Sequence, residues 1–288
     1  MTPTQEKELN DFIKMMEEQG RAKRTLDAYK ERYNMLIRSG KFSKPIHKTG
    51  ENKIVKRIDE MNHTINTKKA LFNLALLLKR ELRNEDTEII KQKLNDINVK
   101  IDKENFSKKE KLNEELPTRD ELIKKLDKLY DDKKWREYIV NYLIIMMNVR
   151  NMDLDVIITR NKNIIDDKDN YLYVKNKSVK YIRNNYKTSA VYGRKEHKIT
   201  DEKFITSCKE YLGLIRQQRY LLENIKTGER VLRVSKSKYI ARIAILTEGK
   251  AFKVNVKHFK NDLYQLRKMS ERRGTSLETI SREYNIDI

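Results

Sequence analysis

The sequence contains few of the residues that build cross-linked or turn-dense proteins. Its 288 residues include one cysteine, three prolines and eight glycines. A single cysteine, Cys208, excludes an internal disulfide framework and any zinc site built from several cysteines. The low proline and glycine counts favour helices over a β-sandwich with many tight turns. We therefore expect a mainly helical, intracellular protein of a reducing compartment, the cytoplasm or the nucleus.

Long hydrophobic runs are also missing. The longest apolar stretch covers residues 138–149, and Asn141 and Asn148 interrupt it. A transmembrane helix needs about 20 apolar residues, so we expect no membrane partner for this chain. The first four residues lack the apolar core of a secretory signal, so the protein is not expected to be secreted.

Motifs for nucleotide and metal chemistry do not occur. The sequence has no phosphate loop of the form G-x-x-x-x-G-K-[ST] and no G-x-G-x-x-G turn. Its histidines lack the spacing of metal ligands; they are His47, His63, His197 and His258. We therefore predict that the protein uses neither a cofactor nor a metal.

Positive charge is what the sequence has in excess. Its 64 Lys and Arg residues outnumber 43 Asp and Glu residues, which leaves a net charge of +21. Two segments hold most of this excess, because residues 175–198 carry +7 and residues 226–273 carry +10. A concentrated positive surface attracts polyanions, of which nucleic acid is the simplest. The alternative is that these bases form the solvated surface of a lysine-rich chain.

Apolar periodicity divides the chain into two regions. Residues 1–83 show helical spacing of apolar residues and predict a small all-helical domain. Residues 84–116 are highly charged and predict a helix that ends in a polar linker. Thr118 and Glu121 have the spacing of a capping box, which marks the start of a second domain over residues 117–288.

The second domain alternates predicted helices with short strands. Strands are expected at 156–159, 171–174, 179–182 and 197–199, with a basic loop at 183–195 in a hairpin. Helices are expected at 119–148, in two pieces, and then at 204–222, 237–246, 256–272 and 276–284. The predicted fold is therefore mainly α, with one small antiparallel sheet.

Three short motifs stand at element boundaries. Arg24-Thr25-Leu26-Asp27-Ala28-Tyr29 and Thr67-Lys68-Lys69-Ala70-Leu71 begin predicted helices of the first domain. Asn148-Val149-Arg150-Asn151-Met152-Asp153-Leu154 follows a buried helix and precedes a strand. In this order they resemble the tyrosine recombinases, or phage-type integrases, whose first arginine box reads G-x-R-x-x-E-L. The resemblance implies a SAM-like core-binding domain followed by an integrase-like catalytic domain.

Arg150 is the residue that the resemblance assigns to the scissile phosphate. A guanidinium fork can bridge two phosphate oxygens and counter the charge that develops in the transition state. Asp153, three residues later, can hold this helix end in place. Asn148 and Asp153 stand where the family has Gly and Glu. The alternative is an Arg/Asp pair that only caps a core helix.

The basic loop supplies a second assigned position. Tyr186-Lys187-Thr188 resembles the family's β-hairpin, in which a lysine enters the minor groove and protonates the leaving 5′ oxygen. Lys187 matches that lysine, and Lys195 in the same loop is not clearly separated from it.

The C-terminal third matches the family only in part. Residues 273–280 resemble a glycine turn that follows the family's H-x-x-R box, and His258 matches the histidine of that box. Asn261 then stands at the arginine position, with Lys260 as a substitute beside it and Arg267 as the next arginine. Tyr284 is the candidate nucleophile, although it follows Gly274 by fewer residues than the family's tyrosine does.

The resemblance implies a protein of a viral or mobile element that cuts and rejoins duplex DNA through a 3′-phosphotyrosyl intermediate. It also implies a dimer or tetramer on DNA. Two alternatives remain open: a recombinase-fold protein without catalysis that binds duplex DNA in a structural or regulatory role, and an unrelated basic helical protein that binds RNA or DNA non-specifically. A type IB topoisomerase shares the same chemistry. Expected DNA contacts are Arg24, Lys68, Lys69, Arg183, Arg194, Lys195, Lys253, Lys257 and Lys260.

Overall fold

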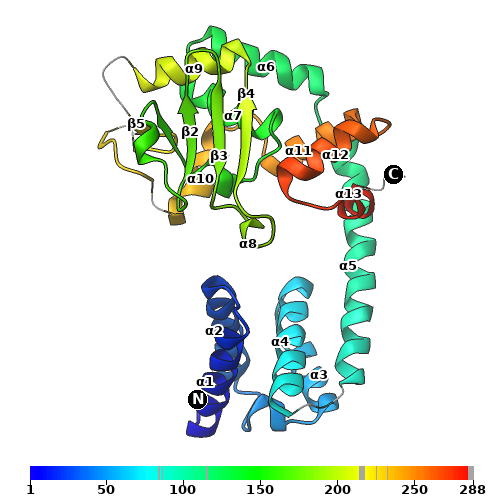
Figure 1. The fold of residues 1–288 in the computed structure, drawn as a ribbon. Coiled ribbons are helices and arrows are strands. Elements are labelled where there is room, and N and C mark those ends of the chain that lie inside the picture. Colours follow the sequence, from blue (N-terminus) through cyan, green and yellow to red (C-terminus); the bar gives the residue numbers. More distant parts are fainter. Residues whose placement is uncertain are drawn as a thin grey trace. The chain divides into compact units, whose positions relative to one another are not determined.

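The computed structural model describes residues 1–83, 85, 87–114, 116–213, 218–224, 226–231 and 233–284, without the side chains of 105–114, 191, 233–235 and 282–284. The chain forms two compact units, Met1–Glu114 and Glu115–Ile288, and each is described by itself. Helices predominate in both units, as the sequence predicts (Figure 1).

The first unit is helical wherever it has regular structure. Its elements are α1 (Pro3–Glu18), α2 (Lys23–Arg38), the 3-10 helix η1 (Ile46–Lys48), α3 (Glu51–Asp59), α4 (Ile65–Arg83) and α5 (Glu88–Glu114). Their apolar faces form one core, which includes Phe12, Tyr33 and Phe72. Helix α5 occupies most of the charged stretch that follows residue 83, and it belongs to this unit.

The second unit contains a β-sheet and most of the remaining helices. The helices are α6 (Arg119–Asp131), α7 (Trp135–Ile145), η2 (Asn151–Leu154), η3 (Lys162–Ile164), α8 (Ser189–Tyr192), α9 (Glu202–Leu212), α10 (Arg233–Ile243), α11 (Glu248–His258), α12 (Leu263–Arg273) and α13 (Leu277–Tyr284). The described strands are β1 (Val156–Thr159), β2 (Asn170–Val174), β3 (Val179–Arg183), β4 (Lys195–Ile199) and β5 (Gln218–Tyr220), in the sheet order β4-β3-β2-β1-β5.

The start of α6 and the burial of α7 agree with the sequence analysis. Thr118 Oγ1 accepts the N–H of Glu121 at 3.2 Å, and the Glu121 carboxylate accepts the N–H of Thr118 at 2.8 Å. This is the predicted capping box. Residues 138–145 of α7 are all buried, because this helix is apolar nearly all round and lies in the core of the unit.

The sheet is mixed, so the prediction of an antiparallel sheet is wrong. β1 and β2 are parallel, with Val156 opposite Asn170, whereas the other strand pairs are antiparallel. Residues 160–169 return the chain to the same end of the sheet before β2 begins, which a tight hairpin turn cannot do.

Two predicted helices are also different in the structure. The helix expected at 204–222 ends at Leu212, where Gly213 adopts a φ of 73°, and β5 follows within the same stretch. The helix expected at 256–272 is two helices, because α11 ends at His258 and Asp262 caps the start of α12. An Asp cap gives the first turn of α12 its own hydrogen-bond acceptor and so starts a new helix.

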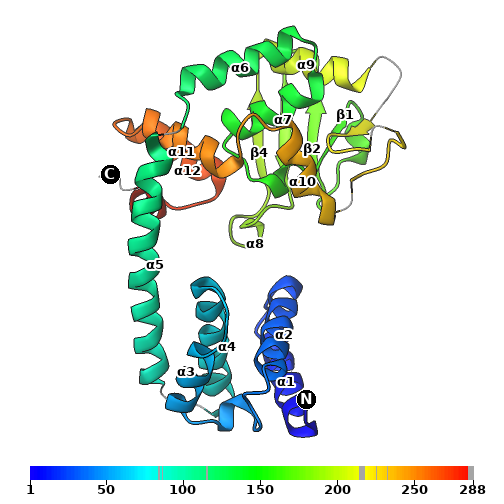
Figure 2. The same cartoon turned by 180° about the vertical axis from the view of Figure 1, so that it is seen from behind.

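The two faces of the sheet have different surroundings. Leu172, Val174, Val179 and Tyr181 are buried in the core that the sheet shares with α7. The sheet lies in front of α7 and α10 in Figure 1 and behind them in Figure 2. Alternate residues of β2 and β3 therefore point to the opposite side, which we call the open face because α7 and α10 lie on the other side of the sheet (Figure 1).

Candidate nucleic-acid interface

The predicted arginine box lies between the end of α7 and the start of β1. Asn148 has a φ of 55°, a left-handed conformation that glycine and asparagine adopt more readily than other residues. This explains how asparagine can stand at a glycine position. Asp153 is fully buried, and its Oδ2 accepts the backbone N–H of Arg150 at 3.0 Å. The carboxylate thus fixes the backbone from which the half-buried Arg150 side chain extends.

Four side chains converge on the carboxyl end of α12. The carbonyl oxygens of Glu271, Arg272, Arg273 and Gly274 accept hydrogen bonds, in that order, from Lys195 Nζ at 2.6 Å, Arg183 Nη1, Arg150 Nη1 at 2.5 Å and Thr188 Oγ1 at 3.4 Å. The last carbonyls of a helix lack partners inside the helix and carry partial negative charge, so cations are stabilised there. The end of α12 therefore joins the arginine box, β3, β4 and the basic loop in one place.

Arg183 is the buried centre of this arrangement. Its side chain is fully buried, and its Nη2 donates to Asp153 Oδ2 at 2.6 Å. Its guanidinium also lies 4.6 Å from the centre of the Tyr186 ring. Burial raises the pKa of Asp153, and the Arg183 charge opposes that rise. Arg183 is a DNA contact expected from the sequence, but in the structure its side chain binds Asp153 and the Arg272 carbonyl at the end of α12.

Five basic side chains gather around this point, and we call them the cation cluster: Arg150, Arg183, Lys195, Arg272 and Arg273. The α12 arginines also reach back to the end of α7, since Arg272 Nη1 donates to the Met146 carbonyl at 3.0 Å and Arg273 Nη1 lies 3.5 Å from that of Asn148. Arg272 and Arg273 thus bind the end of α7, while Arg150 and Arg183 bind the end of α12.

The cations of the cluster act on one another electrostatically. The pKa of Arg150 is lowered first by burial and then by the charge of Arg273. The pKa of Lys195 is lowered by burial and then by Arg183. Burial and the neighbouring cations Arg183, Arg272 and Lys195 lower the pKa of His197 to about 4. Groups that are partly desolvated beside like charges are stabilised by an added anion.

Carboxylates neutralise this cluster only in part. Asp153 pairs with Arg183, and Glu248 Oε1 lies 3.7 Å from Arg273 Nη2. Glu248 also accepts the backbone N–H of Asn151, which ties the start of α11 to the arginine box. In the described part of the chain, no ion pair joins Arg150 or Lys195 to a carboxylate. The same holds for Arg272 among the described residues, so Arg150, Lys195 and Arg272 are the cluster cations with charge available for a bound anion.

Lys187 lies between two residues that contact the site: Tyr186 contacts the cation cluster, and Thr188 contacts the end of α12. Tyr186 packs on Arg183, and Thr188 Oγ1 donates to the Gly274 carbonyl. The Lys187 side chain itself is exposed. The structure therefore brings the loop of Lys187 and the side chain of Arg150 to the same end of α12.

The other predicted catalytic residues are not joined to Arg150 by any contact among the described residues. His258 is exposed at the end of α11, with its ring 4.7 Å from that of Phe259. Arg267 is exposed on α12. Tyr284 is the last residue of α13, and its side chain lies outside the described part of the structure.

The predicted DNA contacts lie on several elements. In the first unit, Arg24 is exposed on α2, whereas Lys68 and Lys69 on α4 are half-buried and Lys68 Nζ donates to the Asp59 carbonyl at 2.6 Å. In the second unit the exposed predicted contacts are Arg194, Lys257 and Lys260, and the half-buried ones are Lys195 and Lys253.

Arg272, Arg273 and His197 were not predicted from the sequence as part of the site. The one local signal for the arginines is their place in the last turn before Gly274, where cations favour the helix C-terminus. Their contacts with Met146 and Asn148 span more than a hundred residues of sequence. No local pattern reports such pairings.

The described residues contain neither a candidate metal site nor a helix that could span a membrane. No three or more His, Cys, Asp and Glu side chains there are grouped so that they could hold a metal ion. Among the described helices, none combines the length and the apolar character that crossing a membrane requires.

Comparison with known proteins shows the fold. No protein-family model matches the chain, and no curated protein matches it. Among solved structures, a lambda integrase dimer bound to a COC′ core site is similar over 98% of this chain and 77% of that one, with 14% identity and a TM-score of 0.54. XerA recombinase is 10% identical over 98% of this chain and 94% of its own, but a TM-score of 0.37 does not establish a common fold. This chain has the integrase-like fold of the tyrosine recombinases.

Proposed function

We propose that the cation cluster binds a backbone phosphate of duplex DNA and that Arg150 is its main contact. The observation that carries this proposal is the state of Arg150: half-buried, beside other cations, and without a carboxylate partner among the described residues. A guanidinium has five N–H donors, and one N–H of Arg150 Nη1 donates to the Arg273 carbonyl. The remaining donors suit two oxygens of a phosphate.

Strand cleavage is the finer part of this proposal. A tyrosine hydroxyl gives its proton to water and its oxygen attacks the phosphorus, the bond from tyrosine oxygen to phosphorus forms, and the bond to the 5′ oxygen breaks. Arg150 stabilises the charge on the phosphate oxygens during this step. Lys187 gives its proton to the leaving 5′ oxygen. Tyr284 is the tyrosine that the sequence offers, and rejoining is the reverse of these steps.

A second candidate function is duplex binding without cleavage, in a structural or regulatory role. Asn261 stands where the family has its second phosphate arginine. His258 and Arg267 make no contact with Arg150 in the described structure. These observations favour a protein that still binds a DNA phosphate at the cation cluster but does not cleave the strand.

A binding measurement tests the phosphate site. We expect Arg150→Ala to weaken duplex DNA binding about ten- to a hundredfold, because a charge-assisted hydrogen bond contributes roughly 1.5–3 kcal/mol. The matched control is Lys124→Ala/Lys125→Ala, which removes two exposed cations from α6 and should leave the affinity close to that of the wild type. Equal losses in both variants, with both folded by circular dichroism, would contradict the site.

A nicked duplex separates the two candidate functions. If the chain cleaves DNA, a substrate nicked beside the scissile phosphate loses its leaving strand and traps a covalent protein–DNA complex. Tyr284→Phe should then bind DNA but form no such complex. Duplex binding without covalent trapping on a library of nicked sequences would support the non-cleaving function instead.

A further inference from the structure

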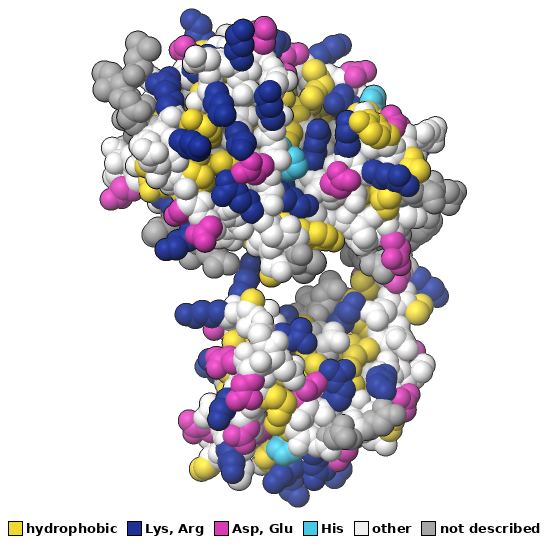
Figure 3. Space-filling model, viewed as in Figure 1, with side chains coloured by type: hydrophobic (Ala, Val, Ile, Leu, Met, Phe, Trp, Pro, Cys, Tyr) yellow, Lys and Arg dark blue, Asp and Glu magenta, His cyan; other side chains and the backbone are white. Residues whose placement is uncertain are grey.

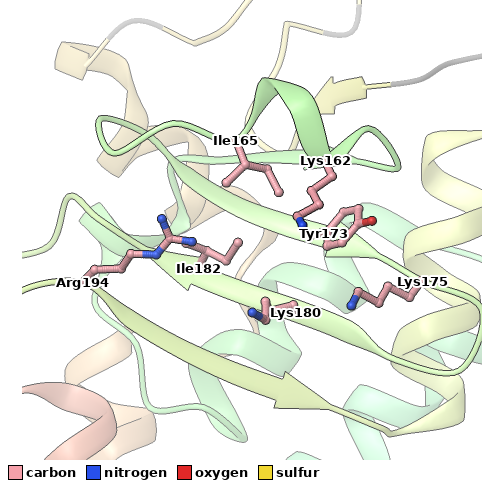
Figure 4. A pocket seen from close by; sticks show the side chains of 7 residues that line it. All are labelled: Lys162, Ile165, Tyr173, Lys175, Lys180, Ile182 and Arg194. Atoms are coloured by element: carbon pink, nitrogen blue, oxygen red, sulfur yellow. The ribbon is translucent and has the colours of Figure 1, made fainter.

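A second basic site lies on the open face of the sheet. A cavity of about 260 Å³ is lined by Lys162, Ile165, Tyr173, Lys175, Lys180, Ile182 and Arg194. Figure 4 shows Arg194 at one end of the cavity and Tyr173 with Lys175 at the other, with the two isoleucines between them. The space-filling view also shows Lys and Arg side chains gathered over this part of the second unit (Figure 3). We call these seven residues the open-face pocket.

The open-face pocket is separate from the cation cluster. Lys195 is the first residue of β4 and Arg194 directly precedes it, and successive side chains of an extended chain point to opposite faces. Lys195 reaches the carbonyl of Glu271 at the end of α12, whereas Arg194 lines the open-face pocket. Tyr173 and Lys180 are directly opposite each other on β2 and β3, so both belong to the open face.

The pocket combines unpaired positive charge with an aromatic surface. No acidic side chain is among its seven lining residues. Glu196 pairs with both Lys180 and Arg194. Among the described residues, no carboxylate forms an ion pair with Lys162 or Lys175. The Lys175 ammonium lies 5.3 Å from the centre of the Tyr173 ring, so charge and aromatic surface are adjacent.

We propose that the open-face pocket binds an unpaired nucleic-acid strand, with one base against Tyr173 and the isoleucines and the flanking phosphates on Lys162 and Lys175. Sequence-independent binding of single strands rests on this combination of a cationic surface and aromatic side chains on which bases stack. Duplex DNA presents its phosphates outward and keeps its bases stacked inside, so it would leave the ring and both isoleucines unused. This inference does not depend on the function proposed for the cation cluster.

Binding of a fluorescent oligodeoxythymidylate, with a duplex of random sequence measured in parallel, tests the proposal. Tyr173→Ala should weaken oligodeoxythymidylate binding by roughly five- to a hundredfold, the range for loss of one base–aromatic stack, and Tyr173→Phe should retain it. Lys162→Ala/Lys175→Ala should lower the magnitude of the negative slope of log affinity against log salt by about 0.7 for each lysine. Duplex affinity should not change in any of these variants.

Control variants keep the outcomes distinct. Lys124→Ala/Lys125→Ala, on α6, removes the same number of exposed cations and should leave the single-strand salt slope unchanged. Unaltered oligodeoxythymidylate binding by both pocket variants would overturn the proposal. Equal losses for duplex and single strand would also overturn it, because the pocket would then be a general backbone contact. Competition by thymidine monophosphate as strong as that by the oligonucleotide would point to a free-nucleotide site and overturn it as well.

Discussion

Arg150 and Arg183 illustrate how burial separates the roles of two identical side chains. Arg183 is fully buried and pairs with Asp153 at 2.6 Å, so its charge is already used inside the protein. Arg150 is half-buried and contacts a backbone carbonyl. Removing one partner of a buried ion pair is strongly destabilising, whereas an unpaired, half-exposed arginine is free to bind a ligand. Loss of Arg183 should therefore affect folding, and loss of Arg150 should affect binding.

His197 makes a pH-dependent contribution to stability. Its pKa falls from 6.5 to about 4 in the folded protein, because of burial and then of nearby cations. Between these two pH values the His197 imidazole is protonated in the unfolded chain but stays neutral in the folded chain. The free energy of unfolding therefore decreases as the pH falls from 6.5 toward 4. We expect urea unfolding to show a fall of up to about 2 kcal/mol from pH 7 to pH 5 that is missing in His197→Phe. The same fall in both proteins would contradict this assignment.

Gly274 is the element-scale feature that fixes the end of α12. It has a φ of 64°, and a Cβ at this position would lie 2.5 Å from Thr188 Oγ1. Gly274→Ala therefore combines backbone strain with a clash against the loop that carries Lys187. We expect a loss of stability of about 2–4 kcal/mol, together with weaker duplex binding, in thermal unfolding and binding measurements.

Gly213→Ala is the matched control for Gly274→Ala. Gly213 also has a positive φ, of 73°, but nothing lies within 4 Å of its added Cβ. Gly213→Ala should therefore lose only the stability that corresponds to backbone strain, about 1–2 kcal/mol. Thr188→Ala should recover part of the stability of Gly274→Ala, because it removes the clashing oxygen. An equal cost for the two glycine substitutions would contradict a contact between α12 and the basic loop.

The elements that the sequence predicts well have local signals. The capping box at Thr118 and the apolar run 138–145 each specify their helix without help from distant residues. The strand β5 and the split between α11 and α12 were not predicted. β5 gains its partner only from pairing with β1, and a single Asp cap starts α12. Hydrophobic period alone reports neither of these.

Only the local part of the candidate site can be predicted from the sequence. Arg150 and Asp153 are three residues apart, and their motif can be recognised in the sequence. Arg150 donates a hydrogen bond to the Arg273 carbonyl, 123 residues later in the sequence, and Arg183 donates one to the Arg272 carbonyl, 89 residues later. These hydrogen bonds depend on the packing of α12 against the sheet. Arg194 and Lys195, which meet where β4 begins, likewise contact different surfaces although both stand in one basic segment of the sequence.

At the scale of the whole molecule, the charge excess is concentrated in the second unit. Both basic segments, 175–198 and 226–273, lie within Glu115–Ile288. The first of them supplies Lys195 to the cation cluster and Lys175, Lys180 and Arg194 to the open-face pocket. Residues 175–198 thus contribute cations to two surfaces of different chemistry, one built on arginines at a helix end and one on lysines beside a tyrosine.

The most direct test of the cation cluster is the salt dependence of duplex DNA binding by Arg150→Gln. The slope of log affinity against log salt is negative, and each phosphate contact that a protein loses lowers its magnitude by about 0.9 for B-form DNA. We predict a slope smaller in magnitude by about this amount for Arg150→Gln, and an unchanged slope for Lys162→Ala/Lys175→Ala. A wild-type slope in Arg150→Gln would contradict the proposal that Arg150 binds a DNA phosphate.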